Sequence, residues 1–208
     1  MPTHVYIDGF NLYYGALKHS NHKWLNLETL CQKLLPEEEV TKIHYFTAKV
    51  DDRGGAEPQQ PVRQQIYLRA LATLPTVSVH FGQFKTRPVR LPLANPKVGE
   101  PRTAEVLRTE EKGSDVNLAT YLLTEGFRRE YATAVVITND SDLKVPIEVV
   151  RNTLGRRVGI INPHRSNRRS RELKGTFIKQ LRDGPLRDSQ FPEELTDHNG
   201  TFRKPKVW

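Results

Sequence analysis

Short apolar runs alternate with longer segments of helical periodicity along most of this chain. The clearest run is TAVVIT at 133–138, whose length and β-branched residues favour a buried strand. The same pattern predicts the remaining elements. Strands are expected at 4–8, 42–49, 77–81, 133–138 and 157–161, and helices at 10–19, 27–35, 62–73, 115–126, 143–154 and 171–183.

Strands that alternate with helices predict an α/β fold, a three-layer α/β/α sandwich around a mainly parallel sheet. A single domain is expected over residues 1–187, with a tail of weak periodicity at 188–208 packed on it. Turn-forming residues predict a loop at 51–61. The proline-rich stretch 82–109 breaks the alternation, so we expect an irregular excursion there, with scope for β-hairpin pairing around 84–91 and 104–109.

Four aspartates occupy positions where such a fold gathers its ligands. Asp8 ends the first strand, Asp140 and Asp142 follow the strand 133–138, and Asp115 opens the helix before that strand. Parallel strands end at one edge of the sheet, and a helix that leads into the next strand begins near that edge. The four carboxylates are therefore expected to converge.

Carboxylates crowded together at neutral pH repel one another unless a cation balances them. Hard oxygen ligands without cysteine or histidine suit Mg²⁺ or Mn²⁺, which activate water and bind phosphate. The alternative for Asp115, Asp140 and Asp142 is helix capping, which aspartate often provides. Asn11, three residues after Asp8, could contact a metal-bound water or a phosphate, or cap a helix.

Three segments resemble the signature blocks of the NYN family, a PIN-like nuclease group. They are YIDGFNLYYG at 6–15, EEKGSDVNLATYLL at 110–123 and VVITNDSDLKVPIEVVR at 135–151. The resemblance implies a PIN-like sandwich and Mg²⁺- or Mn²⁺-dependent cleavage of phosphodiester bonds, usually in RNA. By motif position it implies a catalytic set in which all but the asparagine bind metal: Asp8, Asn11, Asp115, Asp140 and Asp142.

Positive charge is concentrated near the end of the chain. The net charge is +8, and residues 151–187 alone carry eleven lysines and arginines against two acids. This excess suits a polyanion, although a solvated basic surface is the alternative. The residues expected to contact nucleic acid are Lys112, Lys144, Arg165, Arg168, Arg169 and Arg171. By contrast, His4, His44 and His80 lie in apolar strands and are expected to be core residues rather than ligands.

An endoribonuclease is the function these features favour. The alternatives are an RNA-binding regulatory module with little turnover, and another metal-dependent phosphoesterase such as a DNA nuclease or a phosphatase. RNA is preferred to DNA only through the family resemblance, and the oligomeric state stays open. Cys31 is the only cysteine, and neither a secretory signal nor a membrane-spanning run is visible, so a cytoplasmic protein without a membrane partner is expected.

Overall fold

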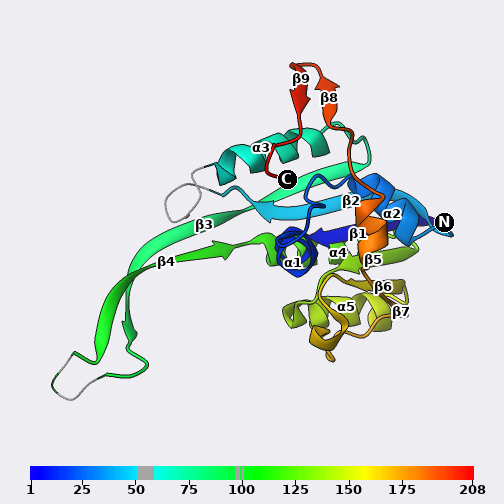
Figure 1. The fold of residues 1–208 in the computed structure, drawn as a ribbon. Helices are drawn as coiled ribbons and strands as arrows, with labels where there is room; N and C mark the ends of the chain where they lie inside the picture. Colours follow the sequence, from blue (N-terminus) through cyan, green and yellow to red (C-terminus); the bar gives the residue numbers. More distant parts are fainter. Residues whose placement is uncertain (51–58, 97–98, 100) are drawn as a thin grey trace.

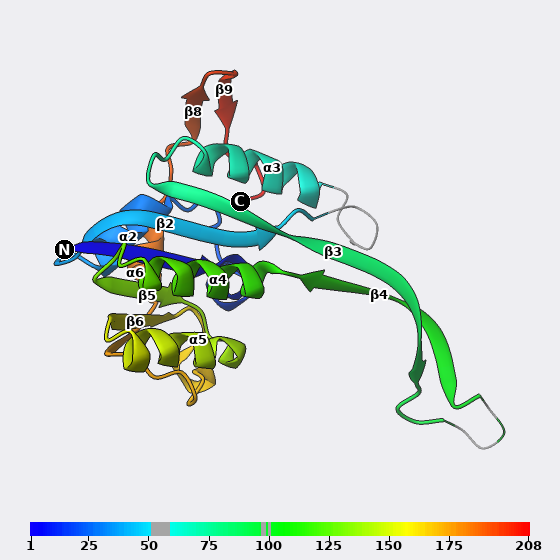
Figure 2. The same ribbon diagram turned by 180° about the vertical axis from the view of Figure 1, so that it is seen from behind.

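A seven-stranded sheet with helices on both faces forms the body of the protein (Figures 1 and 2). The computed structural model describes residues 1–50, 59–96, 99 and 101–208. The predicted loop 51–61 lies largely outside the described residues. The sheet strands are β1 (Pro2–Asp8), β2 (Glu39–Ala48), β3 (Val77–Pro92), β4 (Thr103–Lys112), β5 (Thr133–Ile137), β6 (Arg157–Asn162) and β7 (Phe177–Gln180).

The helices match most of the predicted segments, although two of these are divided. The predicted helix 10–19 consists of a short α-helix and a π-helical segment, and the predicted helix 143–154 begins with a 3-10 turn and ends in a π-helical segment. Their bounds are α1 (Gly9–Leu12), η1 (Tyr13–Leu17), α2 (Leu27–Leu34), α3 (Gln60–Leu71), α4 (Ser114–Phe127), η2 (Ser141–Leu143), α5 (Lys144–Glu148), η3 (Val149–Thr153), η4 (Ser166–Arg168) and α6 (Asp183–Arg187).

The order of strands in the sheet is β4-β3-β2-β1-β5-β6-β7, and all neighbours are parallel except β3 and β4. The chain builds outward from β1 through β2 and β3, then returns to place β5 on the other side of β1. The point where the order reverses, between β1 and β5, is where open α/β sheets form their ligand sites. The α/β sandwich predicted from the sequence is confirmed.

Two hydrophobic cores cover the two faces of the sheet. Val5 and Ile7 of β1 face the core that contains Trp24 and side chains of α2 and α3, whereas Tyr6 faces the core beneath α4 and α5. This division follows from the alternation of side chains along a strand. The segment after α6 joins the first core through Phe191, and it ends in a hairpin of β8 (Glu194–Asp197) and β9 (Gly200–Arg203).

The prediction of an irregular stretch at 82–109 was wrong for most of its length, whereas the β-hairpin pairing expected around 84–91 and 104–109 is confirmed. β3 continues to Pro92 and pairs with β4 in one long antiparallel ribbon that extends beyond the body of the protein (Figures 1 and 2). A proline lacks the amide hydrogen needed inside a sheet, but an edge position tolerates it. Pro88 and Pro92 therefore do not interrupt a ribbon that has only two strands along that part.

The predicted helix 171–183 was also wrong. Phe177–Gln180 forms β7, which pairs in parallel with β6, and only the short α6 follows. The edge of β6 offers unpaired backbone groups, so pairing with it outweighs local helical preference. Gly159 in β6 makes this approach feasible, because a side chain there would collide with the Phe177 ring. Across the described part of the chain, no helix is long and apolar enough to span a bilayer.

Candidate metal centre

Three of the four predicted aspartates meet at the carboxyl edge of the sheet. Asp8 ends β1, Asp140 follows β5, and Asp115 lies in the first turn of α4. One carboxylate oxygen from each lies within 4.8 Å of those of the other two. Asp142 lies outside this three-residue group, in η2, although it is close enough to raise the pKa of Asp115.

Asp8 is held rigidly by its neighbours. It is 3% exposed, and its carboxylate accepts hydrogen bonds from the Asn11 backbone amide (2.9 Å), the Asn11 side-chain amide (2.7 Å) and the Thr138 hydroxyl (3.0 Å). Burial raises the pKa of Asp8, and the nearby Asp140 carboxylate adds to the rise, whereas these hydrogen bonds oppose it. The position of one oxygen donor is thus fixed by the fold.

Asp115 is not a helix cap in this structure. Gly113, at φ +101°, occupies the N-cap of α4, and Glu111 accepts hydrogen bonds from the Ser114 amide (3.1 Å) and hydroxyl (2.7 Å). Burial raises the pKa of Asp115 to about 7, and the negative charges of Asp8 and Asp140 contribute. Asp140 does cap: one of its oxygens accepts from the Asp142 amide at 3.0 Å.

The three carboxylates of this cluster bring negative charge to one point. Within the described ranges, no lysine or arginine forms an ion pair with Asp8, Asp115 or Asp140. Three oxygen donors at one point, two of them with raised pKa values, fit a divalent cation of the Mg²⁺ or Mn²⁺ type. The residues present therefore suit the metal that the sequence implies.

Asn11 connects the aspartates to the loop that follows β6. Its side-chain nitrogen donates to Asp8, while its oxygen accepts from the Asn139 backbone amide (3.2 Å) and lies 3.2 Å from Nε2 of His164. Asn139 in turn donates to the backbone oxygen of Arg168 (2.9 Å). The arginine loop is thus attached to the same edge as the carboxylates.

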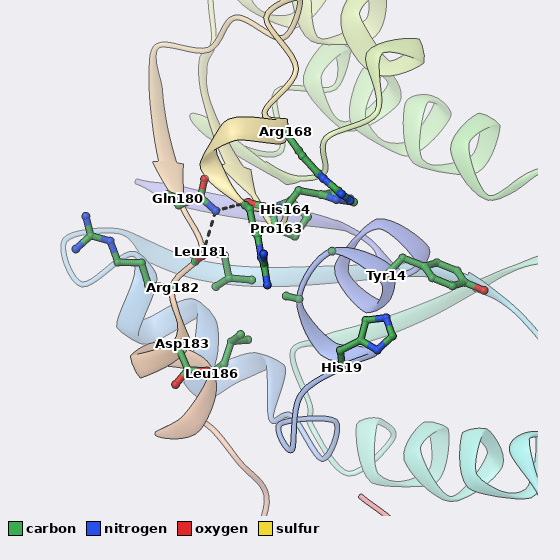
Figure 3. Close-up of a pocket in the computed structure, with 13 residues that line it drawn as sticks. Tyr14, His19, Pro163, His164, Arg168, Gln180, Leu181, Arg182, Asp183 and Leu186 are labelled. Carbon is green, nitrogen blue, oxygen red and sulfur yellow. Dashed lines mark hydrogen bonds between the residues drawn. The ribbon is translucent and has the colours of Figure 1, made fainter.

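The predicted basic residues differ in how free their charges are. Both lysines form ion pairs: Nζ of Lys112 lies 3.7 Å from Oε2 of Glu110, and Nζ of Lys144 lies 3.5 Å from Oε2 of Glu172. The four arginines are exposed, and the part of the chain that the structure describes supplies no acidic partner for them: Arg165, Arg168, Arg169 and Arg171. Arg165 and Arg168 also line a cavity of about 640 Å³ beside Asn11, between η1 and the loop after β6 (Figure 3).

A second polar cluster lies under α4, the helix that carries Asp115. Its central residue, Glu125, was not among the residues predicted from the sequence. Glu125, near the end of α4, accepts from Tyr6 (2.6 Å), and its carboxylate lies 2.7 Å from Nδ1 of His4 and 3.1 Å from Nε2 of His44. His80 contacts His44 at 2.9 Å. The spacing of Leu118, Leu122 and Glu125, which share a helix face, was the available signal.

These groups satisfy one another. Burial would raise the pKa of Glu125, but the hydrogen bonds from His4, His44 and Tyr6 outweigh it and hold that pKa well below its usual range. The two histidines and the glutamate are of types that bind transition metals, and their ligand atoms lie within 4.8 Å of one another. In this structure the three side chains also form a hydrogen-bonded network with Tyr6.

Comparisons with known proteins agree with the fold. The chain is 28% identical over 237 aligned residues to 6-hydroxy-3-succinoylpyridine 3-monooxygenase HspA of Pseudomonas putida, covering 100% of this chain and 75% of that protein. A crystal structure of a Vibrio parahaemolyticus protein of unknown function superposes with a TM-score of 0.57 at 12% identity, covering 88% of this chain and 93% of that one. This second likeness concerns the fold alone.

A family model settles the relationship that the three sequence blocks suggested. The model of the NYN domain matches residues 2–181, which include the aspartate cluster and most of both hydrophobic cores beneath it. The chain therefore belongs to the NYN domain family of PIN-like nucleases.

Proposed function

We propose that this protein is a metal-dependent endoribonuclease that cleaves phosphodiester bonds at the aspartate cluster. The observation that carries the proposal is the approach of three carboxylates to within 4.8 Å, where no lysine or arginine of the described residues forms an ion pair with them. Asp8, Asp115 and Asp140 would hold Mg²⁺ or Mn²⁺, and Asp142 would contribute from the following turn. Such an ion supplies an activated water and stabilises charge on the leaving oxygen.

The chain's own residues have distinct tasks in this proposal. Asn11 keeps Asp8 in place and presents its amide beside the scissile phosphate. The exposed arginines at 165–171 bind the flanking phosphates, because guanidinium groups match phosphate oxygens in charge and geometry. Membership of a nuclease family supports a nucleic-acid substrate, and RNA is the class that the family resemblance favours.

Cleavage of end-labelled single-stranded RNA and DNA, with Mn²⁺ or Mg²⁺ against EDTA, tests the proposal. Asp140→Asn retains an oxygen that can accept from the Asp142 amide but removes one ligand charge. Glu37→Gln, at an exposed position before β2, is the matched control. We expect metal-dependent RNA cleavage that Asp140→Asn abolishes and Glu37→Gln preserves. Full activity in Asp140→Asn would overturn the assignment of the site.

Oxidation of a small aromatic acid is a second candidate, because the relative named as a monooxygenase matches the whole chain and a cavity lies beside the cluster. Incubation with 6-hydroxy-3-succinoylpyridine, dioxygen and a reduced nicotinamide distinguishes the two. Substrate loss coupled to reductant oxidation would support this candidate, and the absence of turnover together with RNA cleavage would exclude it.

A further inference from the structure

The cavity beside Asn11 is lined by several polar and basic side chains. Its walls come from η1, from the loop after β6 and from the segment between β7 and α6. In Figure 3, the imidazole of His164 projects into it, Arg168 reaches across one side toward Tyr14, and the side chain of Arg182 turns away. Gln180 stabilises the wall by donating to the backbone oxygens of His164 and Leu181.

The cavity and the metal centre share a wall. Nε2 of His164 lies 3.2 Å from the Asn11 side-chain oxygen, and the Asn11 nitrogen donates to Asp8. His164 also packs closely against η1, because a Cβ at Gly15 would lie 2.8 Å from the His164 ring. A ligand in the cavity would therefore be separated from a phosphate at the aspartates by the side chains of His164 and Asn11.

The lining favours an anion with an aromatic group. Arg165 and Arg168 bring guanidinium groups that the described residues leave without an acidic partner, and His19 adds a further donor. Tyr14 is 56% exposed, and the Nζ of Lys18 lies 5.0 Å from the centroid of its ring, so this side of the lining combines an aromatic group with a further cation. One acid, Asp183, is among the residues of the lining, and it is 3.0 Å from Nε2 of His22.

We propose that this cavity is a subsite for one nucleoside monophosphate unit, whose phosphate contacts Arg165 and Arg168 and whose base stacks on Tyr14. Its volume of about 640 Å³ is within the range of small-ligand pockets. The unit is either the nucleotide that flanks the scissile bond or a free mononucleotide. This proposal deepens the proposed nuclease function and rests on it for the strand-bound case.

Binding of uridine monophosphate, measured by calorimetry in EDTA, tests the subsite without the metal. We expect saturable binding to the wild type, weakening of at least about tenfold in the Arg165→Ala/Arg168→Ala protein, and weaker binding of uridine than of the monophosphate. Arg128→Ala/Arg203→Ala, which removes two exposed arginines outside the cavity lining, is the matched control and should bind as the wild type does. Equal binding by the double variant, or no binding at millimolar concentration, would overturn the proposal.

Competition against a short RNA distinguishes the two sources of the ligand. Competitive inhibition of cleavage by the monophosphate, together with a raised KM in the double variant, assigns the subsite to the strand. Inhibition without competition assigns it to a free nucleotide. The two proposals can fail separately. Binding of the monophosphate without any RNA cleavage would support the subsite and overturn the nuclease function. RNA cleavage without binding of the monophosphate would support the nuclease function and overturn the subsite.

Discussion

The first turn of α4 places Asp115 beside Asp8 and Asp140, and about three turns later the same helix places Glu125 among His4, His44 and Tyr6. Burial raises the pKa of Asp115 to about 7, with a contribution from the neighbouring carboxylates. Burial also acts on Glu125, but surrounding donors reverse its effect and lower that pKa.

The difference lies in what surrounds each carboxylate rather than in its depth. Glu125 receives hydrogen bonds from three side chains of β1 and β2, so its charge is stabilised within the protein. In the aspartate cluster three carboxylates face one another, and the hydrogen bonds to Asp8 only partly offset this, so a bound cation would add the missing positive charge. One cluster therefore supports the fold, and the other is prepared for a cation at the point where the order of strands reverses.

Removal of the Glu125 carboxylate should have the largest effect on stability. Glu125→Ala leaves His4, His44 and Tyr6 without their shared acceptor, and the free energy of unfolding should fall by about 3–5 kcal/mol. Urea denaturation measures this. Metal binding by the protein that remains folded should not change. A loss below about 1 kcal/mol would mean that the network contributes little to the fold.

Asp115→Asn should strongly reduce cleavage but should not reduce stability, in contrast to Glu125→Ala. The change keeps the shape of the side chain but removes a proposed ligand charge, and cleavage should fall by about 10²–10³-fold. The free energy of unfolding of the metal-free protein should be equal or higher, because repulsion within the cluster is relieved. Single-turnover kinetics and urea denaturation measure both. Wild-type cleavage rates would remove Asp115 from the site.

The two clusters should also respond differently to pH. Asp115 retains its proton in the folded state up to a pKa of about 7, whereas the unfolded chain loses it near pH 4. In EDTA, its contribution to the free energy of unfolding therefore falls as the pH rises from about 4 to 7. Between about pH 6 and 8 Glu125 is ionised in both states and adds no slope.

His80 changes the free energy of unfolding in the opposite direction over part of this pH range. Burial lowers the pKa of His80 to about 4, so its contribution to stability rises between about pH 4 and 6.5. The difference between the wild type and Asp115→Asn isolates the aspartate. Urea denaturation in EDTA at several pH values should show this difference, and Mn²⁺ at pH 7 to 8 should stabilise the wild type more than the variant, because the variant has lost a proposed ligand charge. A difference that does not vary with pH would contradict the account.

The smallest effect concerns the arginines on the loop beside the cluster. Arg168→Ala/Arg169→Ala should weaken RNA binding and reduce the slope of log affinity against log salt by about 0.7 for each phosphate that the variant no longer neutralises. Arg128→Ala/Arg203→Ala, which removes two exposed arginines elsewhere, is the control. An unchanged slope in the first variant would show that these side chains do not bind phosphate.

Much of the arrangement could be predicted because its signals are local or topological. The buried run at 133–138 identified β5, and the alternation of elements predicted the parallel sheet. From that order alone, Asp8, Asp115 and Asp140 had to approach one edge. Asp142 lies further along the chain in η2, because the backbone there uses Asp140 as its cap.

The remaining features depend on contacts between distant segments. β7 exists because β6 offers it an edge, and the β3–β4 ribbon exists because its two strands satisfy each other despite Pro88. The prediction that three histidines lie in the core is confirmed for His4 and His44, with exposures of 2% and 4%, but His80 is only partly buried. Their partner Glu125 could not be assigned from β1 and β2 alone, because its place was set by how α4 packs across them.

Mn²⁺ binding, measured by electron paramagnetic resonance in the wild type, Asp140→Asn and Glu125→Gln proteins, tests the central claim most directly because it needs no substrate. The account predicts that the wild type binds Mn²⁺, that Asp140→Asn weakens binding by at least about tenfold, and that Glu125→Gln leaves it unchanged. Unchanged affinity in Asp140→Asn with loss in Glu125→Gln would contradict it, and would place the metal among His4, His44 and Glu125.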